Sequence, residues 1–252
     1  MLGLGTSICR PAYLKEDSYA VTRSVFLDGT DAHIIINNSV ANDIKNVGSM
    51  SIWLKNTNAH QNDTIFNLHT GTSNDNKIAI LFINQGGQEL IRFNSRGSSS
   101  NTILDHNYAV ELQDGEGDPS WIHFAATWSR TANKMAMYIN GSSVATSTSA
   151  MTDYATTADT IYIGKPGNAN NAFFEGNFSS LSLFDAVLSA SDVTTLYNSG
   201  KPGDVSASGI SSLVAWLPLD ETSGNFIDRT STGADGVPTN IASSQQGVED
   251  VP

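Results

Sequence analysis

The sequence predicts an all-β domain, either a sandwich or a barrel, that carries one short helix. Short runs rich in β-branched and aromatic residues alternate with clusters of Gly, Asn, Asp and Ser about every 8 to 15 residues, which is typical of these folds. The chain has 252 residues, enough for one large β domain with a substantial core. A helical spacing of apolar residues stands out only near residues 190–198.

The expected strands are bounded by turn-forming residues. The run "KIAILFIN" is apolar on both faces and therefore predicts a central strand. Pro218 predicts that the last strand is an edge strand or contains a bulge. The candidate strands lie at residues 24–27, 33–36, 50–55, 64–68, 77–84, 89–94, 101–104, 121–129, 134–139, 144–147, 160–163, 177–184 and 213–219.

The clearest hairpin lies within "WIHFAATWSRTANKMAMYINGSSVATS". Met135, Met137 and Ile139 are predicted to face one way, and the residues between them the other. Asn140 and Gly141 form an "NG" pair, which is typical of a type I′ turn because both residues tolerate positive φ.

The one expected helix follows the strand at 177–184. Ser189 fits its N-cap, and Asp192 stands in the capping-box position three residues later. Gly200 is expected as the residue that ends it in a left-handed conformation, before Pro202. The helix is too short to be stable alone, so we expect it to form a lid over an open edge or end of the sheets. Its apolar stripe is Val193, Leu196 and Tyr197.

The chain is expected to form one domain with two extensions. Residues 1–23 are irregular and predict an N-terminal arm, and residues 241–252 predict a loose C-terminal tail. The domain spans residues 24–240, with a linker at 206–212 and a closing segment at 213–236.

Composition argues against nucleic acid and membrane as partners. The net charge is -12 and the 13 basic residues are scattered, whereas phosphate binding needs clustered Lys and Arg. No stretch approaches the roughly 18 apolar residues of a membrane span. The start of the chain has no signal-peptide pattern, which predicts synthesis in the cytoplasm. The single cysteine, Cys9, cannot form an internal disulfide.

Several phrases resemble a known family. "SVFLDGTDAHIII", "SMSIWLKN" and "GNFSSLSLFDAVLSASDVTTLYNSG", in this order, look like the laminin-G-like, pentraxin-related domains. "LVAWLPLDETSGNFIDRTSTGADG" resembles a further family segment. The resemblance implies a concanavalin A-like jelly-roll sandwich, with two antiparallel sheets. "MLGLGTSI", "LYNSGKPGD" and "EDVP" also resemble proteins of marine bacteriophages in style.

The resemblance implies a first candidate site. Pentraxin-like members carry an Asp-Asn pair before a central strand that binds calcium, and Asp75 and Asn76 match it here. The family's other ligands come from a later loop, which here supplies Asn168, Asn170 and Asn171 instead of acidic residues. We expect all five residues to bind ligand, and Asp75, Asn76 and Asn168 to bind calcium. An ordinary polar loop is the alternative, because calcium favours several carboxylates.

Two further acidic groups are weaker candidates. Glu111, Asp114, Glu116 and Asp118 resemble the carboxylates of glycosidases with this fold, but their spacing differs and Gly and Pro predict a loop. The second group would form a structural cation site if the last strand lies beside the first, although turn chemistry explains the same residues. It comprises Asp28, Asp31, Asp220, Glu221 and Asp228.

These observations favour a non-enzymatic surface module that binds glycan or a neighbouring virion protein. The expected location is the virion surface, as a phage decoration or fibre-associated protein. A second copy of the module, in a homo-oligomer, is a further candidate partner. A secreted or cell-surface, calcium-dependent lectin-like module is the first alternative. A glycoside hydrolase of the same fold is the second.

Overall fold

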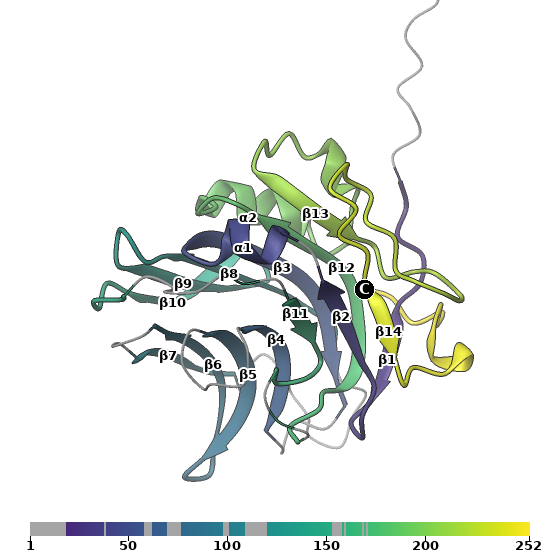
Figure 1. Cartoon of the computed structure of the whole chain (residues 1–252), viewed down its shortest axis with the longest axis horizontal. Helices are drawn as coiled ribbons and strands as arrows, with labels where there is room; N and C mark the ends of the chain where they lie inside the picture. Colours follow the sequence, from purple (N-terminus) through teal and green to yellow (C-terminus); the bar gives the residue numbers. More distant parts are fainter. Residues whose placement is uncertain are drawn as a thin grey trace, which may run out of the picture.

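The computed structural model describes residues 19–37, 39–57, 62–69, 77–97, 101–108, 120–152, 158, 160–167, 169 and 171–252. Two antiparallel sheets pack face to face in a sandwich (Figure 1). Sheet 1 has the strand order β1-β12-β3-β8-β9-β10, and β13 also pairs with β12. Sheet 2 has the order β14-β2-β11-β4-β5-β6-β7. The predicted two-sheet jelly-roll class is confirmed.

The strands of sheet 1 are β1 (Val25–Asp28), β3 (Val47–Asn56), β8 (Ile122–Ser129), β9 (Lys134–Ile139), β10 (Ser142–Ser147), β12 (Glu175–Phe184) and β13 (Leu213–Leu217). Those of sheet 2 are β2 (His33–Asn37), β4 (Asp63–His69), β5 (Lys77–Gln85), β6 (Gln88–Arg96), β7 (Asn101–Asn107), β11 (Thr160–Ile163) and β14 (Val237–Thr239). Helical turns are α1 (Val40–Ile44), α2 (Ala190–Tyr197), η1 (Val205–Ala207) and η2 (Ser243–Gln245). No helix of the described part is long and apolar enough to cross a membrane.

The main core lies between the two sheets and follows the predicted alternation. Met135, Met137 and Ile139 of β9 point into it, as expected from the hairpin pattern. Asn140 and Gly141 both have positive φ, 49° and 79°, which confirms the turn. Strand β5 lies between β4 and β6, so "KIAILFIN" is an internal strand as predicted.

Helix α2 forms with the predicted N-cap but ends differently. Ser189 and Asp192 make the reciprocal capping box. The left-handed cap is Asn198, with φ 47°, and not Gly200, because Asn tolerates this conformation and Gly200 lies two residues further on.

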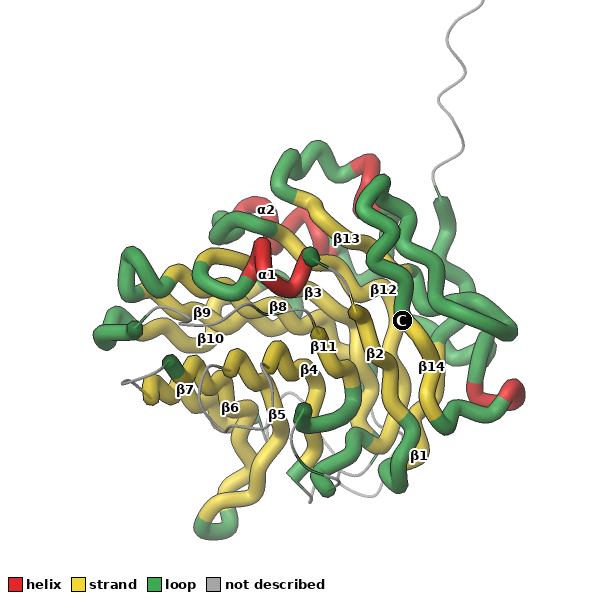
Figure 2. Tube along the Cα trace, viewed as in Figure 1, coloured by secondary structure: helices red, strands yellow, loops and turns green. Residues whose placement is uncertain are grey.

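Helix α2 also lies elsewhere than expected. It covers the outer face of sheet 1 rather than an edge or end of the sandwich (Figure 2). Val193 and Leu196 of α2 join a second apolar cluster there, together with Trp216 of β13 and Tyr138 of β9. The outer face of this sheet is therefore partly a second core, which explains why apolar residues also occupy outward positions.

Two elements were not expected. Helix α1 buries Val40, Ala41 and Ile44, and its five residues are too few for a helical period to stand out. Strand β14 contains Pro238, which argues against a strand, yet β14 lies at the edge of sheet 2, where Pro is tolerated. Strand β13 pairs only with β12 and ends at Leu217, immediately before Pro218, in agreement with the edge-strand prediction.

The two extensions pack against the domain where they are described. Tyr19 packs edge-on against Trp216, with ring centroids 5.4 Å apart, and Val21 is buried. The tail is not loose, in contrast to the expectation: Ser24 and Val248 exchange two backbone hydrogen bonds of 2.9 Å. Asp250 accepts hydrogen bonds from Lys55 at 3.0 Å and from Trp121 at 2.9 Å.

Candidate functional site

Most of the predicted ligand residues lie outside the described part of the chain. This holds for Asp75, Asn76, Asn168 and Asn170, and for the acidic run Glu111, Asp114, Glu116 and Asp118. Asn171 is described, and it is exposed. The two predicted segments can therefore be located only through their described neighbours.

Those neighbours meet on the outer face of sheet 2. Lys77, which follows Asn76, is the register partner of His69 at the end of β4. Gly167, which precedes Asn168, lies so close to the same strand that a Cβ there would be 2.9 Å from Cβ of His69 and 3.0 Å from Oδ1 of Asn67. The structure thus places Lys77 and Gly167 at the same end of β4, although they are far apart in the sequence.

A row of outward-facing residues crosses this face beside that point. Asn67 and Asn94 are separated by Ala79, and their side-chain oxygens are buried without a hydrogen-bond partner. Tyr162 is the register partner of Asn67 on the other side and is partly exposed. The complete row is Val237, Ile35, Tyr162, Asn67, Ala79, Asn94 and Ile103.

The neighbouring row is cationic. Lys77 is the register partner of Arg96, and His69 lies on the other side of Lys77. Burial, together with the charge of Arg96, lowers the pKa of Lys77. The outer face of sheet 2 therefore combines hydrogen-bond acceptors, one aromatic ring and local positive charge in a protein of net charge -12.

The second acidic group does not form a cation site. Asp28 accepts the backbone N–H of Thr30 at 3.0 Å in the turn after β1, and Asp31 accepts from Asn240 at 2.9 Å. Within the described residues no group of three or more acidic, His or Cys side chains could hold a metal ion. The turn interpretation is correct, and the cation-site hypothesis is wrong for these residues.

The other members of that group have structural partners. Asp220 accepts from the hydroxyl of Tyr19 at 2.9 Å, and Glu221 accepts the N–H of Ile227 at 3.0 Å. Burial opposes ionisation of Asp228, but the backbone N–H groups of Trp216 and Thr230 outweigh it and lower the pKa of Asp228. These carboxylates fix the closing segment to sheet 1.

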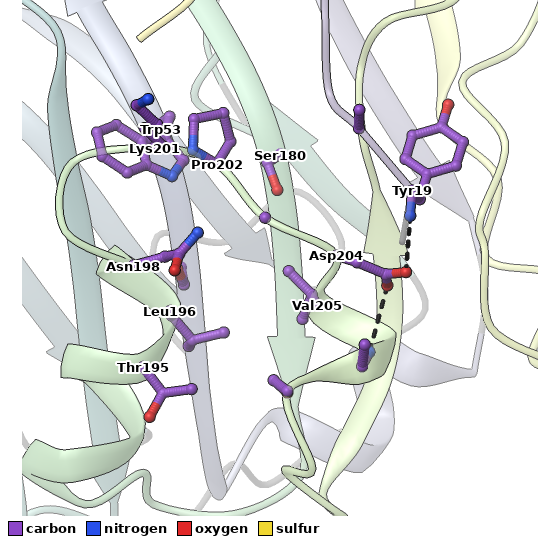
Figure 3. Close-up of a pocket in the computed structure, with 15 residues that line it drawn as sticks. Tyr19, Trp53, Ser180, Thr195, Leu196, Asn198, Lys201, Pro202, Asp204 and Val205 are labelled. Atoms are coloured by element: carbon purple, nitrogen blue, oxygen red, sulfur yellow. Dashed lines mark hydrogen bonds between the residues drawn. The ribbon is translucent and has the colours of Figure 1, made fainter. Parts of the chain in front are cut away.

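A cleft of about 480 Å³ opens on the outer face of sheet 1 (Figure 3). Ser51 and Trp53 of β3 and Ser180 of β12 form its floor. The C-terminal end of α2 forms one wall, and Tyr19 with residues 203–208 forms the opposite one. Sequence reasoning treated α2 as a lid without a site, because a local pattern does not show which residues from other strands lie beside a helix.

Ser51 of the floor forms a hydrogen-bonded pair with His123 of the neighbouring strand β8. Oγ of Ser51 lies 2.7 Å from Nε2 of His123, but Nδ1 of His123 is buried without a partner. Burial lowers the pKa of His123 to about 3. Such an imidazole is a weak base, and no carboxylate stabilises its charged form as in a serine-hydrolase triad. We therefore interpret the pair as a structural hydrogen bond.

The two antiparallel sheets define a β-sandwich of the kind that lectins and glucanases share. The family model of the concanavalin A-like lectin/glucanases superfamily matches residues 28–194, more than half of the chain. The protein belongs to this superfamily. No curated protein matches the chain in sequence.

Solved structures with the same fold include carbohydrate-binding domains. The CBM40 module of the Ruminococcus gnavus IT-sialidase is 15% identical with a TM-score of 0.54, covering 69% of this chain and 96% of the module. Domain 4 of an extracellular arabinanase from Geobacillus stearothermophilus, solved with arabinotriose, is 20% identical with a TM-score of 0.50, covering 69% and 76%.

A pentraxin has the same fold. The heptameric SAP-like pentraxin of Limulus polyphemus is 17% identical with a TM-score of 0.51, covering 78% of this chain and 93% of its own. At these identities the likenesses show the fold alone.

Proposed function

We propose that the protein is a non-enzymatic surface module that binds glycan on the outer face of sheet 2. The observation that carries this proposal is the pair Asn67 and Asn94, whose side-chain oxygens are buried without partners on either side of Ala79. An acceptor buried without a partner costs about 1 to 3 kcal/mol, so each amide gains if its side chain turns its oxygen outward to a ligand donor. Sugars supply hydroxyl donors for this purpose.

The surroundings of the two amides suit a sugar as well. Neighbouring strands lie about 4.8 Å apart, so the two amides are separated by about 10 Å, which suits an oligosaccharide rather than one sugar unit. Tyr162 beside Asn67 offers an aromatic face to the apolar side of a sugar ring. The solved carbohydrate-binding domains of the same fold support this choice of ligand.

Calcium at Asp75, Asn76 and Asn168 belongs to the same proposal. Of these residues only Asp75 is a carboxylate, and Lys77 with Arg96 follow at the same end of the sheet. Calcium favours several carboxylate oxygens, and nearby positive charge opposes it. We therefore expect any calcium effect on the melting temperature only at about millimolar concentration, and none after chelation.

A glycan array with the full chain, with calcium and with chelator, tests the proposal. We expect binding to an oligosaccharide that Asn94→Ala weakens by about tenfold, because one amide contact is worth about 1.4 kcal/mol. Asn84→Ala changes an exposed Asn of the same sheet and serves as the matched control. Failure to bind any glycan, or equal losses in both variants, would contradict the proposal.

A virion location is the finer part of this proposal. It is supported by the resemblance of residues 1–8 and 196–204 to phage proteins. Mass spectrometry of purified particles tests it, with the module expected in fixed proportion to the major capsid protein. Its absence from particles would leave a secreted or cell-surface lectin-like role.

A further inference from the structure

The cleft on the outer face of sheet 1 has the dimensions of a small-ligand site. Its volume of about 480 Å³ falls within the roughly 300 to 1,000 Å³ of such sites. It interrupts an otherwise apolar surface, since Leu196 and Val205 beside it belong to the second apolar cluster. The floor of the cleft includes two side chains that carry hydroxyl groups, Ser51 and Ser180.

The floor hydroxyls are held in fixed positions. Oγ of Ser51 lies 2.7 Å from Nε2 of His123, and Oγ of Ser180 accepts the indole N–H of Trp216 at 3.1 Å. A hydroxyl can take part in three hydrogen bonds, so each retains capacity for a ligand. Because their orientation is already set, a ligand would lose little further side-chain entropy on binding them.

The backbone of β12 is distorted where the floor forms. The pairing of β12 with β3 shifts register between Ser179 and Ser182, and Ser180 has a left-handed φ of 48°. A bulge of this kind redirects a side chain, and a positive φ costs a non-glycine residue about 1 kcal/mol or more. Here the distortion places Ser180 in the cleft.

The walls add an amide, a hydroxyl, aromatic surface and two opposite charges, those of Lys201 and Asp204. Asp204 already accepts hydrogen bonds from the backbone of Tyr19 and Ala207 and from Ser206. Lys201, just beyond the C-terminal end of α2, balances the charge of Asp204, so the lining has no net charge. Thr195 of α2 and Asn198 just after it lie on the other side of the cleft from Tyr19 (Figure 3).

From this lining we infer that the cleft is a second carbohydrate site, which takes a neutral sugar unit. A neutral sugar presents hydroxyl groups to Ser51, Ser180 and Asn198, and apolar ring faces to the aromatic and aliphatic walls. The inference extends the proposed function from one face to both outer faces of the sandwich. A single copy of the module would then bind two glycan chains at once.

The N-terminal arm completes this site. Tyr19 and Ala20 line the cleft, and Tyr19 is fixed by its backbone N–H on Asp204 and its hydroxyl on Asp220. The guanidinium of Arg229 lies 4.9 Å from the centre of its ring. Binding in the cleft therefore depends on the arm being in place.

Saturation-transfer NMR on the full chain tests the inference, with the methyl glycosides of glucose, galactose, mannose and N-acetylglucosamine as probes. We expect transfer to at least one probe, nearly unchanged between about 50 and 500 mM salt because the probes are neutral and the lining has no net charge. Ala207→Trp fills the mouth of the cleft from an exposed position and should abolish the transfer. Ala132→Trp, an exposed Ala in the β8–β9 turn, should leave it unchanged.

The outcomes separate the two sites. If Ala207→Trp binds the probes as the unchanged protein does, or if none binds, the cleft is not a sugar site. Oligosaccharide binding that persists in Ala207→Trp and weakens in Asn94→Ala would then leave the proposed function intact. A signal that falls steeply with salt would also overturn the inference, because it would require a charged ligand.

Discussion

At the scale of single residues, Asp63 is an unusual ionisable group. It lies at the start of β4, is only 3% exposed, and one of its oxygens has no partner. Burial, and then the charge of Glu175, raises its pKa to about 7. The folded protein therefore favours the protonated form of Asp63 near neutral pH.

Stability is expected to depend on pH through this residue. The folded pKa lies above the unfolded value of 3.8, so its contribution is fully present below 3.8 and is lost as pH rises through about 7. Asp63→Asn removes this ionisation. The free energy of unfolding of the variant minus that of the unchanged protein should be larger at pH 8 than at pH 4, by on the order of 2 to 4 kcal/mol. Urea denaturation across this range measures the difference.

Asp185 offers a control for this experiment, because it is an exposed carboxylate. Asp185→Asn should change stability by a similar small amount at all pH values. A difference between Asp63→Asn and the unchanged protein that is equal at pH 4 and pH 8 would show that Asp63 is ionised in the fold.

The residues of the candidate sites could be predicted only in part. Asp75 and Asn76 stand out because they are adjacent in sequence and match a family phrase. Asn67 and Asn94 lie on different strands, 27 positions apart, and meet only through β5. The alternation of each strand could have indicated that its Asn faces outward. Which outward amides become neighbours depends on the register between strands, which the alternation does not give.

At the scale of elements, α2 shows what a local pattern can and cannot predict. Its N-cap, its buried residues Val193 and Leu196, and its length follow from short-range chemistry and were expected. Its position on the face of sheet 1 depends on outward apolar residues of other strands, such as Tyr138 and Trp216. The sequence predicted these residues as parts of the main core. An apolar residue in a strand does not by itself indicate whether it faces the other sheet or a helix on the outer face.

The capping box of α2 should be important to this element. Ser189→Ala removes the acceptor for the backbone N–H of Asp192 and should cost about 1 kcal/mol, because a short helix depends strongly on its cap. Thermal unfolding measures it. Ser211→Ala changes an exposed serine outside α2 and should cost less than about 0.5 kcal/mol. Equal losses would show that the cap does not stabilise α2.

At the scale of the whole molecule, the C-terminal tail is an integral part of the sandwich. Asp250 joins Lys55 of β3 to the indole of Trp121, and the side chain of Lys55 is only 11% exposed. Glu249 beside it pairs with Arg23, but its side chain is 80% exposed. The polar composition predicted a loose tail. The partners of these polar residues lie far away in sequence, so the sequence alone does not reveal them.

These two neighbours allow a matched test. Asp250→Ala should destabilise the protein by about 1 to 3 kcal/mol, because a mostly buried ammonium and an indole N–H lose their acceptor. Glu249→Ala should cost less than about 1 kcal/mol, as expected for an exposed ion pair. Chemical denaturation compares them, and a larger loss in Glu249→Ala would contradict this account of the tail.

The pairing of Ser24 with Val248 also determines how the molecule would respond to mechanical force. The two residues are antiparallel neighbours, so the chain enters at Ser24 and leaves at Val248 on the same side. A pull on the two ends would load their two hydrogen bonds of 2.9 Å one after the other, as in opening a zipper. Sheet 2, which carries the first proposed site, lies outside that force path and would be loaded only after this pair has opened. Tyr19 and Ala20 of the cleft precede Ser24 and would be pulled away first.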